Sequence, residues 1–136
     1  DVICLDGDLG AGKTTFTQGL AAGLKIADHY VSSPSFSIMH EYRNGEIPLY
    51  HFDFYRLGSA DEIFELGFEE YFYGNGVSVI EWPVRVGENL PEKRLDIIFS
   101  ITGDNQREVL LKVYEEAWAK RVKGLLNVFK NGFQAG

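Results

Sequence analysis

The sequence is poor in cysteine, in basic residues and in long apolar runs. Its one cysteine, Cys4, excludes a disulfide within the chain and suits a reducing compartment. Lysine and arginine number 13 against 20 aspartates and glutamates, so the formal net charge is −7 and tight duplex binding by this chain alone is not expected. No apolar run approaches the roughly 20 residues of a membrane-spanning helix. We therefore expect a cytoplasmic protein with no membrane contact.

The residues that are present suit one compact α/β domain over residues 1–136. Hydrophobic residues make up 45% of the chain and aromatic residues 14%, which is enough for a substantial core. The length leaves no room for a second full domain. The chain begins at Asp1, without an initiator methionine and directly at an apolar run. We therefore expect a natural N-terminal segment to precede Asp1.

The first elements follow in the order strand, loop, helix. Residues 2–5 are apolar and predict a buried strand that leads into a glycine-rich turn. Phe16, Leu20 and Leu24 recur every four positions, which predicts the packed face of a helix over residues 13–24. Cys4 lies within the apolar run, and we expect it to be an inert thiol of the core.

The rest of the chain predicts further strands and two more helices. Pro48 predicts that the returning strand of a hairpin begins at a sheet edge, and Ser59 with Glu62 forms a capping-box pattern. The pattern predicts a hairpin over 36–54, a helix from about residue 60, strands over 77–82, 95–101 and 109–113, and a closing helix. The closing helix has an apolar face of Trp118, Val122, Leu125, Leu126 and Phe129. The predicted fold class is α/β, with a mixed sheet flanked by helices.

The turn after the first strand carries a phosphate-binding motif. It fits the Walker A pattern without exception, as Gly7-Asp8-Leu9-Gly10-Ala11-Gly12-Lys13-Thr14. Glycines let the backbone curl so that its N–H groups point at phosphate oxygens, and the following helix presents its positive end to the same anion. Lys13 would reach the β and γ phosphates, and the Thr14 hydroxyl would ligate Mg²⁺. The motif predicts a single P-loop NTPase domain.

Two acidic residues close predicted strands. Phosphoryl chemistry needs a carboxylate near the metal and another that orients the attacking water. Asp53 and Glu81 each end an apolar strand and are candidates for these roles, with a solvated strand end as the alternative for each. Residues 32–37 form a candidate switch segment, with a plain surface loop as the alternative. The histidines, His29, His40 and His51, have no metal-ligand spacing and are assigned no role.

Four blocks of sequence together resemble a known family. Residues 7–16, 31–36, 51–57 and 80–83 stand in the order found in the TsaE family, the bacterial ATPases of tRNA threonylcarbamoyladenosine biosynthesis. The resemblance implies ATP hydrolysis that supports transfer of a threonylcarbamoyl group to an adenosine of tRNA. It also implies docking on a heterodimer of TsaD and TsaB, so that tRNA is contacted only indirectly.

The resemblance also implies roles for individual residues. Thr14 and Glu81 would ligate Mg²⁺, and Asp53 would be the acid needed for turnover. Lys13, Asp53 and Glu81 would form the catalytic set, with Trp82 as an aromatic neighbour. The phosphates of ATP would be held by Gly10, Ala11, Gly12, Lys13, Thr14 and Thr15.

Other P-loop functions fit the phosphate motif alone. A small P-loop kinase is one alternative, but it needs an arginine-bearing lid, and the basic stretch over residues 85–94 is sparse and interrupted by Glu88 and Glu92. An interaction module gated by bound ATP, without hydrolysis, is the other. A GTPase is disfavoured because the Asn-Lys-x-Asp signature is absent from the sequence.

Overall fold

The computed structural model describes residues 1–8, 11–26, 39–43, 45–54, 67–87 and 90–135, and its centre is one six-stranded sheet. The strands are β1 (Val2–Gly7), β2 (Met39–Tyr42), β3 (Leu49–Asp53), β4 (Val77–Glu81), β5 (Leu95–Gly103) and β6 (Gln106–Val113). Their order in the sheet is β2-β3-β4-β1-β5-β6. The four central strands are parallel, and the edge strands β2 and β6 run antiparallel to their neighbours. The predicted mixed sheet is confirmed.

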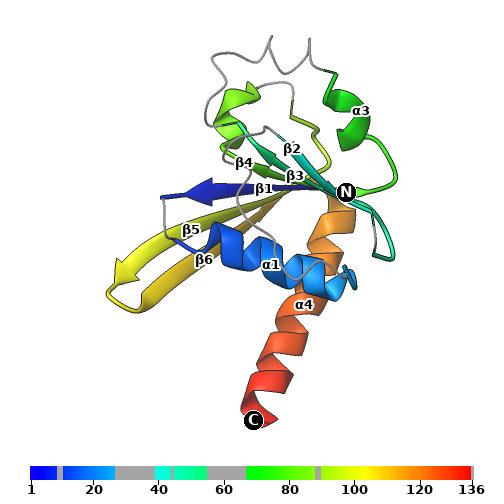
Figure 1. The fold of residues 1–136 in the computed structure, drawn as a ribbon. Helices are drawn as coiled ribbons and strands as arrows, with labels where there is room; N and C mark the ends of the chain where they lie inside the picture. Colours follow the sequence, from blue (N-terminus) through cyan, green and yellow to red (C-terminus); the bar gives the residue numbers. More distant parts are fainter. Residues whose placement is uncertain (9–10, 27–38, 44, 55–66, 88–89, 136) are drawn as a thin grey trace.

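Helices cover both faces of this sheet (Figure 1). Helix α1 (Lys13–Gly23) and helix α4 (Glu116–Ala135) lie on one side, while the short helix α3 (Glu69–Phe72) lies on the other. A 3-10 turn, η1 (Pro83–Arg85), follows β4. The alternation of side chains in β1 explains the two layers: Ile3 and Leu5 join the core on the α1 side, and Val2 and Cys4 join the core on the α3 side. Cys4 is therefore a buried core thiol, as expected.

The core on the α3 side is built from aromatic rings around Phe52 of β3. The Phe52 ring centroid lies 5.3 to 5.5 Å from those of Phe54, Phe68 and Phe72. Rings in such arrangements contribute about 0.5–1.5 kcal/mol per pair beyond the area they bury. Phe52 is fully buried, so the strand that carries His51 and Asp53 on its opposite face is firmly held.

The packing of α1 differs from the prediction. Its buried residues are Lys13, Thr17 and Ala21. The predicted Phe16, Leu20 and Leu24 are only partly buried and pack against the core. Small side chains at the contact let the helix lie close to the sheet, and the larger ones then fill the space on either side. The helix was predicted correctly, but the centre of its buried face was shifted by one residue.

Two predictions about edges and ends also need correction. Pro48 does not mark an edge strand, because β3 lies between β2 and β4; the proline precedes the strand and its carbonyl accepts from Val77 N at 2.9 Å. In α4, Trp118 is buried, but Leu125 and Leu126 are about half exposed, at 48% and 51%. The helix extends past the sheet, which therefore covers only its first turns (Figure 1).

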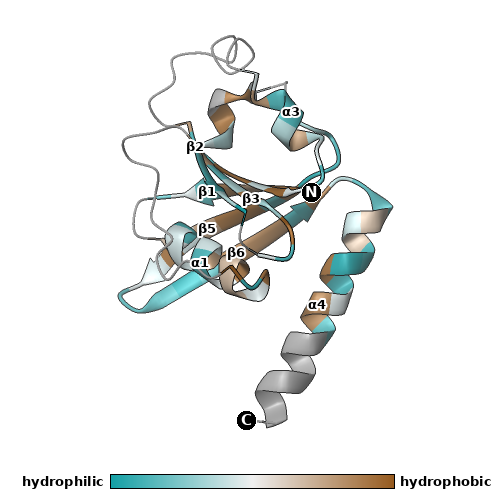
Figure 2. Ribbon diagram, turned by 45° about the vertical axis from the view of Figure 1, so that its right-hand side comes forward, coloured by the Kyte–Doolittle hydropathy of each residue, from teal (hydrophilic) through white to brown (hydrophobic). Residues whose placement is uncertain are grey.

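The two strands predicted over 95–101 and 109–113 are β5 and β6, which pair as an antiparallel hairpin with Gly103 opposite Gln106 next to the turn. It is hydrophobic along the sheet and hydrophilic at its tip (Figure 2). Within the described residues, no helix is both long and apolar enough to cross a membrane. Several predictions concern residues outside the described part: Gly10, His29, the switch at 32–37, the first residues of the hairpin, and the helix predicted from Ser59.

Candidate functional site

Two glycines at the ends of the segment between β1 and α1 have backbone angles that other residues rarely adopt. Gly7 has a φ of 141°, and a Cβ atom at this position would lie 2.5 Å from the carbonyl oxygen of Phe99 on the neighbouring strand β5. Gly12, with a φ of 118°, is the N-cap residue of α1. The Ala11 amide donates to the Asp8 carbonyl at 3.1 Å, which tightens the loop. These conformations let the chain leave the sheet and turn at once into a helix.

The N-terminus of α1 presents amide donors that have no acceptor within the helix. The first intrahelical bond runs from Phe16 N to Gly12 O at 3.0 Å, which leaves the amides of Lys13, Thr14 and Thr15 without a helical acceptor. No described side chain caps this end, and its first turn has no acidic residue. The positive end of the helix dipole adds to these donors. The arrangement can bind an anion such as phosphate.

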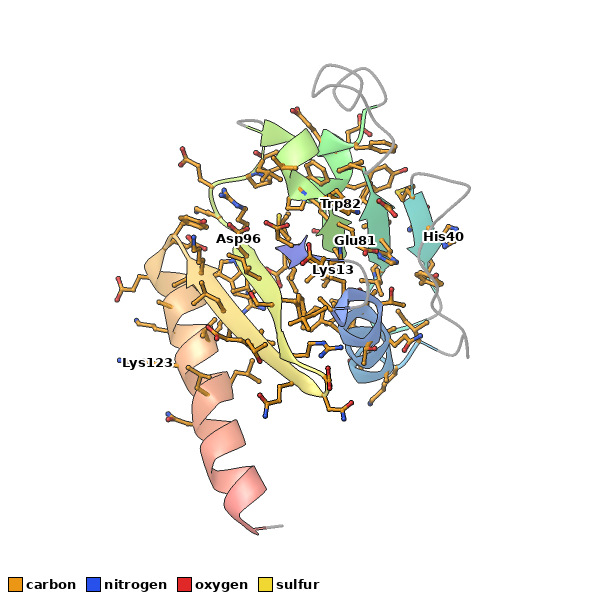
Figure 3. All side chains as sticks on the ribbon, turned by 90° about the vertical axis from the view of Figure 1, so that its left-hand side faces the viewer. Lys13, His40, Glu81, Trp82, Asp96 and Lys123 are labelled. Atoms are coloured by element: carbon orange, nitrogen blue, oxygen red, sulfur yellow. The ribbon has the colours of Figure 1, made fainter. Side chains whose placement is uncertain are left out.

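Lys13 and Trp82 meet at this end of the sheet. Lys13 is 5% exposed, and its Nζ lies 4.5 Å from the centroid of the Trp82 ring (Figure 3). Trp82 directly follows β4 and adopts a left-handed conformation, with φ 60° and ψ 52°. Such a backbone is unfavourable by about 1–3 kcal/mol for a bulky residue. In this conformation the indole lies against Lys13 and partners its nearly buried ammonium group.

The two predicted acids lie side by side at the same edge. Asp53 and Glu81 are register partners on the parallel strands β3 and β4, and Glu81 is also the partner of Leu5 on β1. The carboxyl ends of β3 and β4 therefore lie together, and β1 continues beside them to Gly7, where the phosphate motif begins. Glu81 is 4% exposed and Asp53 is half-buried. The structure thus brings Lys13, Asp53 and Glu81 to one end of the sheet, and their roles in catalysis stay a prediction.

Sequence reasoning missed the partner of Glu81. The Nε2 atom of His51 lies 2.6 Å from Glu81 Oε2, and both side chains are buried. His51 stands two residues before Asp53, so both lie on one face of β3. This spacing could have predicted that His51 lies near the two acids. His40 lies on the edge strand β2, where burial and the neighbouring His51 lower its pKa, and it remains without an assigned role.

A cavity of about 520 Å³ opens beside the loop, toward the β5–β6 hairpin. It is lined by Ala11, Gly12, Thr15, Phe16, Phe99, Asn105, Arg107 and Val109. Its walls are mostly apolar and aromatic, with polar groups from the hairpin tip. A cavity of this kind, continuous with a helix N-terminus, can take a flat ring attached to a phosphate chain.

Comparisons with known proteins identify the family. The family model described as "Threonylcarbamoyl adenosine biosynthesis protein TsaE" matches residues 1–109. Proteins named "tRNA threonylcarbamoyladenosine biosynthesis protein TsaE" are similar to this chain. The one from Bacillus subtilis is 51% identical over 109 residues, which cover 80% of this chain and 67% of that protein. The one from Treponema pallidum is 44% identical over 108 residues, 79% of this chain and 78% of that protein.

The fold gives the same result. A crystal structure of Bacillus subtilis YdiB superposes with a TM-score of 0.76 and 39% sequence identity, over 93% of this chain and 77% of that chain. The architecture is that of a P-loop NTPase. The resemblance seen in the four sequence blocks is therefore confirmed, and the chain belongs to the TsaE family of tRNA threonylcarbamoyladenosine biosynthesis.

Proposed function

We propose that residues 1–136 form a single P-loop domain that hydrolyses ATP with Mg²⁺. The observation that carries the proposal is the N-terminus of α1, which no described side chain caps, with Lys13 and Glu81 beside it. The family supports a role in threonylcarbamoyladenosine modification of tRNA. In this proposal the chain works in the cytoplasm with the TsaD and TsaB heterodimer and meets tRNA only through it.

The phosphates of ATP would lie on the loop and the first turn of α1. Gly10, Ala11, Gly12, Lys13, Thr14 and Thr15 would supply the donors. The ammonium of Lys13 lies over the Trp82 ring, and such a cation–π contact is favourable by about 2 kcal/mol when it is desolvated. A phosphate oxygen is a stronger partner because both groups are charged. ATP would therefore draw the ammonium from the indole to the γ phosphate.

The side chains at this edge fit a magnesium ion. The Thr14 hydroxyl and the Glu81 carboxylate are oxygen donors, the type that Mg²⁺ prefers. Among the described residues, no three His, Cys, Asp or Glu side chains lie close enough together to hold a metal by themselves. Mg²⁺ in nucleotide enzymes takes one or two protein ligands and completes its shell with phosphate and water. Bound here, it would neutralise the charge that develops on the phosphates.

Asp53 would orient the attacking water. It stands beside Glu81 in register, so one carboxylate can serve the metal while the other faces the water. The nucleoside would occupy the cavity next to Thr15, with its base against Phe99 and with Asn105 and Arg107 at the rim. Both assignments follow from position relative to the phosphate loop: the acids lie on the side of Lys13, and the cavity lies on the side of Thr15.

The test uses purified protein with [γ-³²P]ATP and Mg²⁺, with and without the TsaD and TsaB heterodimer. We expect slow release of labelled phosphate that the heterodimer accelerates. Label on a small-molecule acceptor would instead indicate the kinase, and retention of ATP without any product would indicate the gated module.

Lys13→Ala provides the control for this assay. Loss of one charge-assisted hydrogen bond removes about 1.5–3 kcal/mol of binding free energy, a change of roughly 10- to 100-fold in the dissociation constant measured by calorimetry. An unchanged ATP affinity in this variant would refute the site.

A further inference from the structure

The contact between His51 and Glu81 carries an inference that rests on the proposed function and deepens it. His51 lies in the middle of β3, its side chain is 0% exposed, and its Nε2 is 2.6 Å from Glu81 Oε2. We propose that His51 is a positioning residue: it holds the Glu81 carboxylate in the one orientation that serves the metal ion. His51 itself does not touch substrate or metal in this proposal.

The hydrogen bond fixes the tautomer of the imidazole. Among the described residues, His51 Nδ1 has no hydrogen-bond partner, although it is fully buried. A protonated imidazole, or one that accepts from Glu81 at Nε2, would leave an unpaired N–H at Nδ1. Buried N–H groups without a partner are rare, whereas an unpaired lone pair is better tolerated. We therefore assign the proton to Nε2, which donates to the Glu81 carboxylate.

A purely structural role explains this histidine poorly. Its neighbours toward the start of the strand, Leu49 and Val79, are apolar, and the polar groups on this face are His40 on β2 and the two acids at the strand ends. An unpaired buried polar atom costs about 1–3 kcal/mol, and a leucine or phenylalanine in the same space would avoid that cost. The bond from Nε2 to Glu81 is what distinguishes histidine from an apolar residue at this position.

The hydrogen bond from His51 restricts the orientation of the Glu81 carboxylate and so determines which oxygen can bind the metal ion. One oxygen of Glu81, Oε2, is tied to His51, so the other is left for the ion. The backbone that carries the ring is held in place, because the aromatic cluster around Phe52 packs against β3 from the opposite face. Groups that hold a metal ligand in place change metal affinity by roughly 10- to 100-fold when removed. His51 should have an effect of that size.

Two substitutions separate the hydrogen bond from the presence of a polar side chain. In His51→Gln the side-chain amide nitrogen reaches the position of Nε2, whereas in His51→Asn it reaches only the position of Nδ1. Both side chains are neutral and neither titrates near neutral pH. Mn²⁺ binding to the protein–ADP complex, followed by electron paramagnetic resonance, and ADP affinity without metal, followed by calorimetry, are measured for each.

We expect His51→Asn to weaken Mn²⁺ binding roughly 10- to 100-fold and to leave metal-free ADP affinity unchanged, while His51→Gln restores most of the Mn²⁺ affinity. Equal losses in both variants would indicate a structural role and overturn the proposal, as would wild-type Mn²⁺ affinity in His51→Asn. If the wild-type protein binds neither ADP nor Mn²⁺, the proposed function fails as well, so the two failures are distinguishable.

A measurement on the unmodified protein covers variants that do not fold. Nitrogen-15 NMR of the imidazole groups reports which ring nitrogen carries the proton, in the absence of metal and nucleotide. We expect the Nε2–H tautomer for His51. A proton on Nδ1 would overturn the proposal whatever the variants show.

Discussion

The close approach of Gly7 to β5 makes Gly7→Ala a direct test of the loop geometry. The new Cβ would lie 2.5 Å from the Phe99 carbonyl oxygen and 3.1 Å from the Phe99 Cβ. Gly7 and Phe99 are register partners, so neither strand can yield without disturbing the sheet. The φ of 141° is also one that an alanine rarely adopts.

The magnitude follows from these two effects. Overpacking against backbone costs about 1–3 kcal/mol, and the unfavourable φ adds about 1–3 kcal/mol. The sum, about 2–6 kcal/mol, is a large fraction of the 5–15 kcal/mol typical of a folded domain. Gly19→Ala is the matched control, because Gly19 lies within α1 and a Cβ there meets no atom within 4 Å. It should stabilise the protein by about 0.5–1 kcal/mol.

Urea denaturation gives the free energy of unfolding for both variants, and calorimetry gives their affinity for ADP. We expect Gly7→Ala to lose stability and nucleotide binding, and Gly19→Ala to gain stability and keep its affinity. A Gly7→Ala protein that unfolds at the wild-type urea concentration and still binds ADP would show that the loop geometry has been misjudged.

Two further predictions concern charge. Glu81→Gln keeps the size of the side chain but loses the negative charge, so we expect phosphate release to fall by more than roughly 10-fold with ADP affinity retained; unchanged release would remove Glu81 from the metal site. Burial, with a contribution from Asp96, raises the pKa of Cys4 above its ordinary value of 9.0. The folded protein then holds the thiol proton more tightly than the unfolded chain does. The contribution of Cys4 to the free energy of unfolding is therefore fully present below pH 9.0 and is lost as the pH rises above it. Denaturation at increasing pH should show a fall of up to about 1.4 kcal/mol per pH unit from this group, and Cys4→Ala should flatten it; equal slopes in both proteins would contradict the assignment.

Short-range patterns allowed much of the fold to be predicted. The Walker A spacing places glycine where Gly7 and Gly12 need positive φ angles, and it gives the order strand, loop, helix. Alternation located β5, strand patterns located β4 and the second half of β6, and the strand ends located Asp53 and Glu81. These features depend on residues close in sequence, and a single sequence contains them.

Contacts between distant residues could not be predicted in this way. The bond from His51 to Glu81 depends on which strands are neighbours and in what register, and the pairing of Lys13 with Trp82 depends on the left-handed turn after β4. Helical periodicity in α4 identified an apolar face but not how much of the sheet would cover it, so Leu125 remains half exposed. The central residues of the α1 face, Thr17 and Ala21, were missed because close approach favours small side chains.

The most direct test of the account is a crystal structure of the protein with Mg²⁺ and a non-hydrolysable ATP analogue. The account expects phosphate oxygens to accept from the amides of Lys13, Thr14 and Thr15, the ammonium of Lys13 to have left Trp82 for a phosphate, and the ion to be bound by Thr14 and Glu81. A nucleotide bound elsewhere, with the α1 amides free of phosphate, would contradict it.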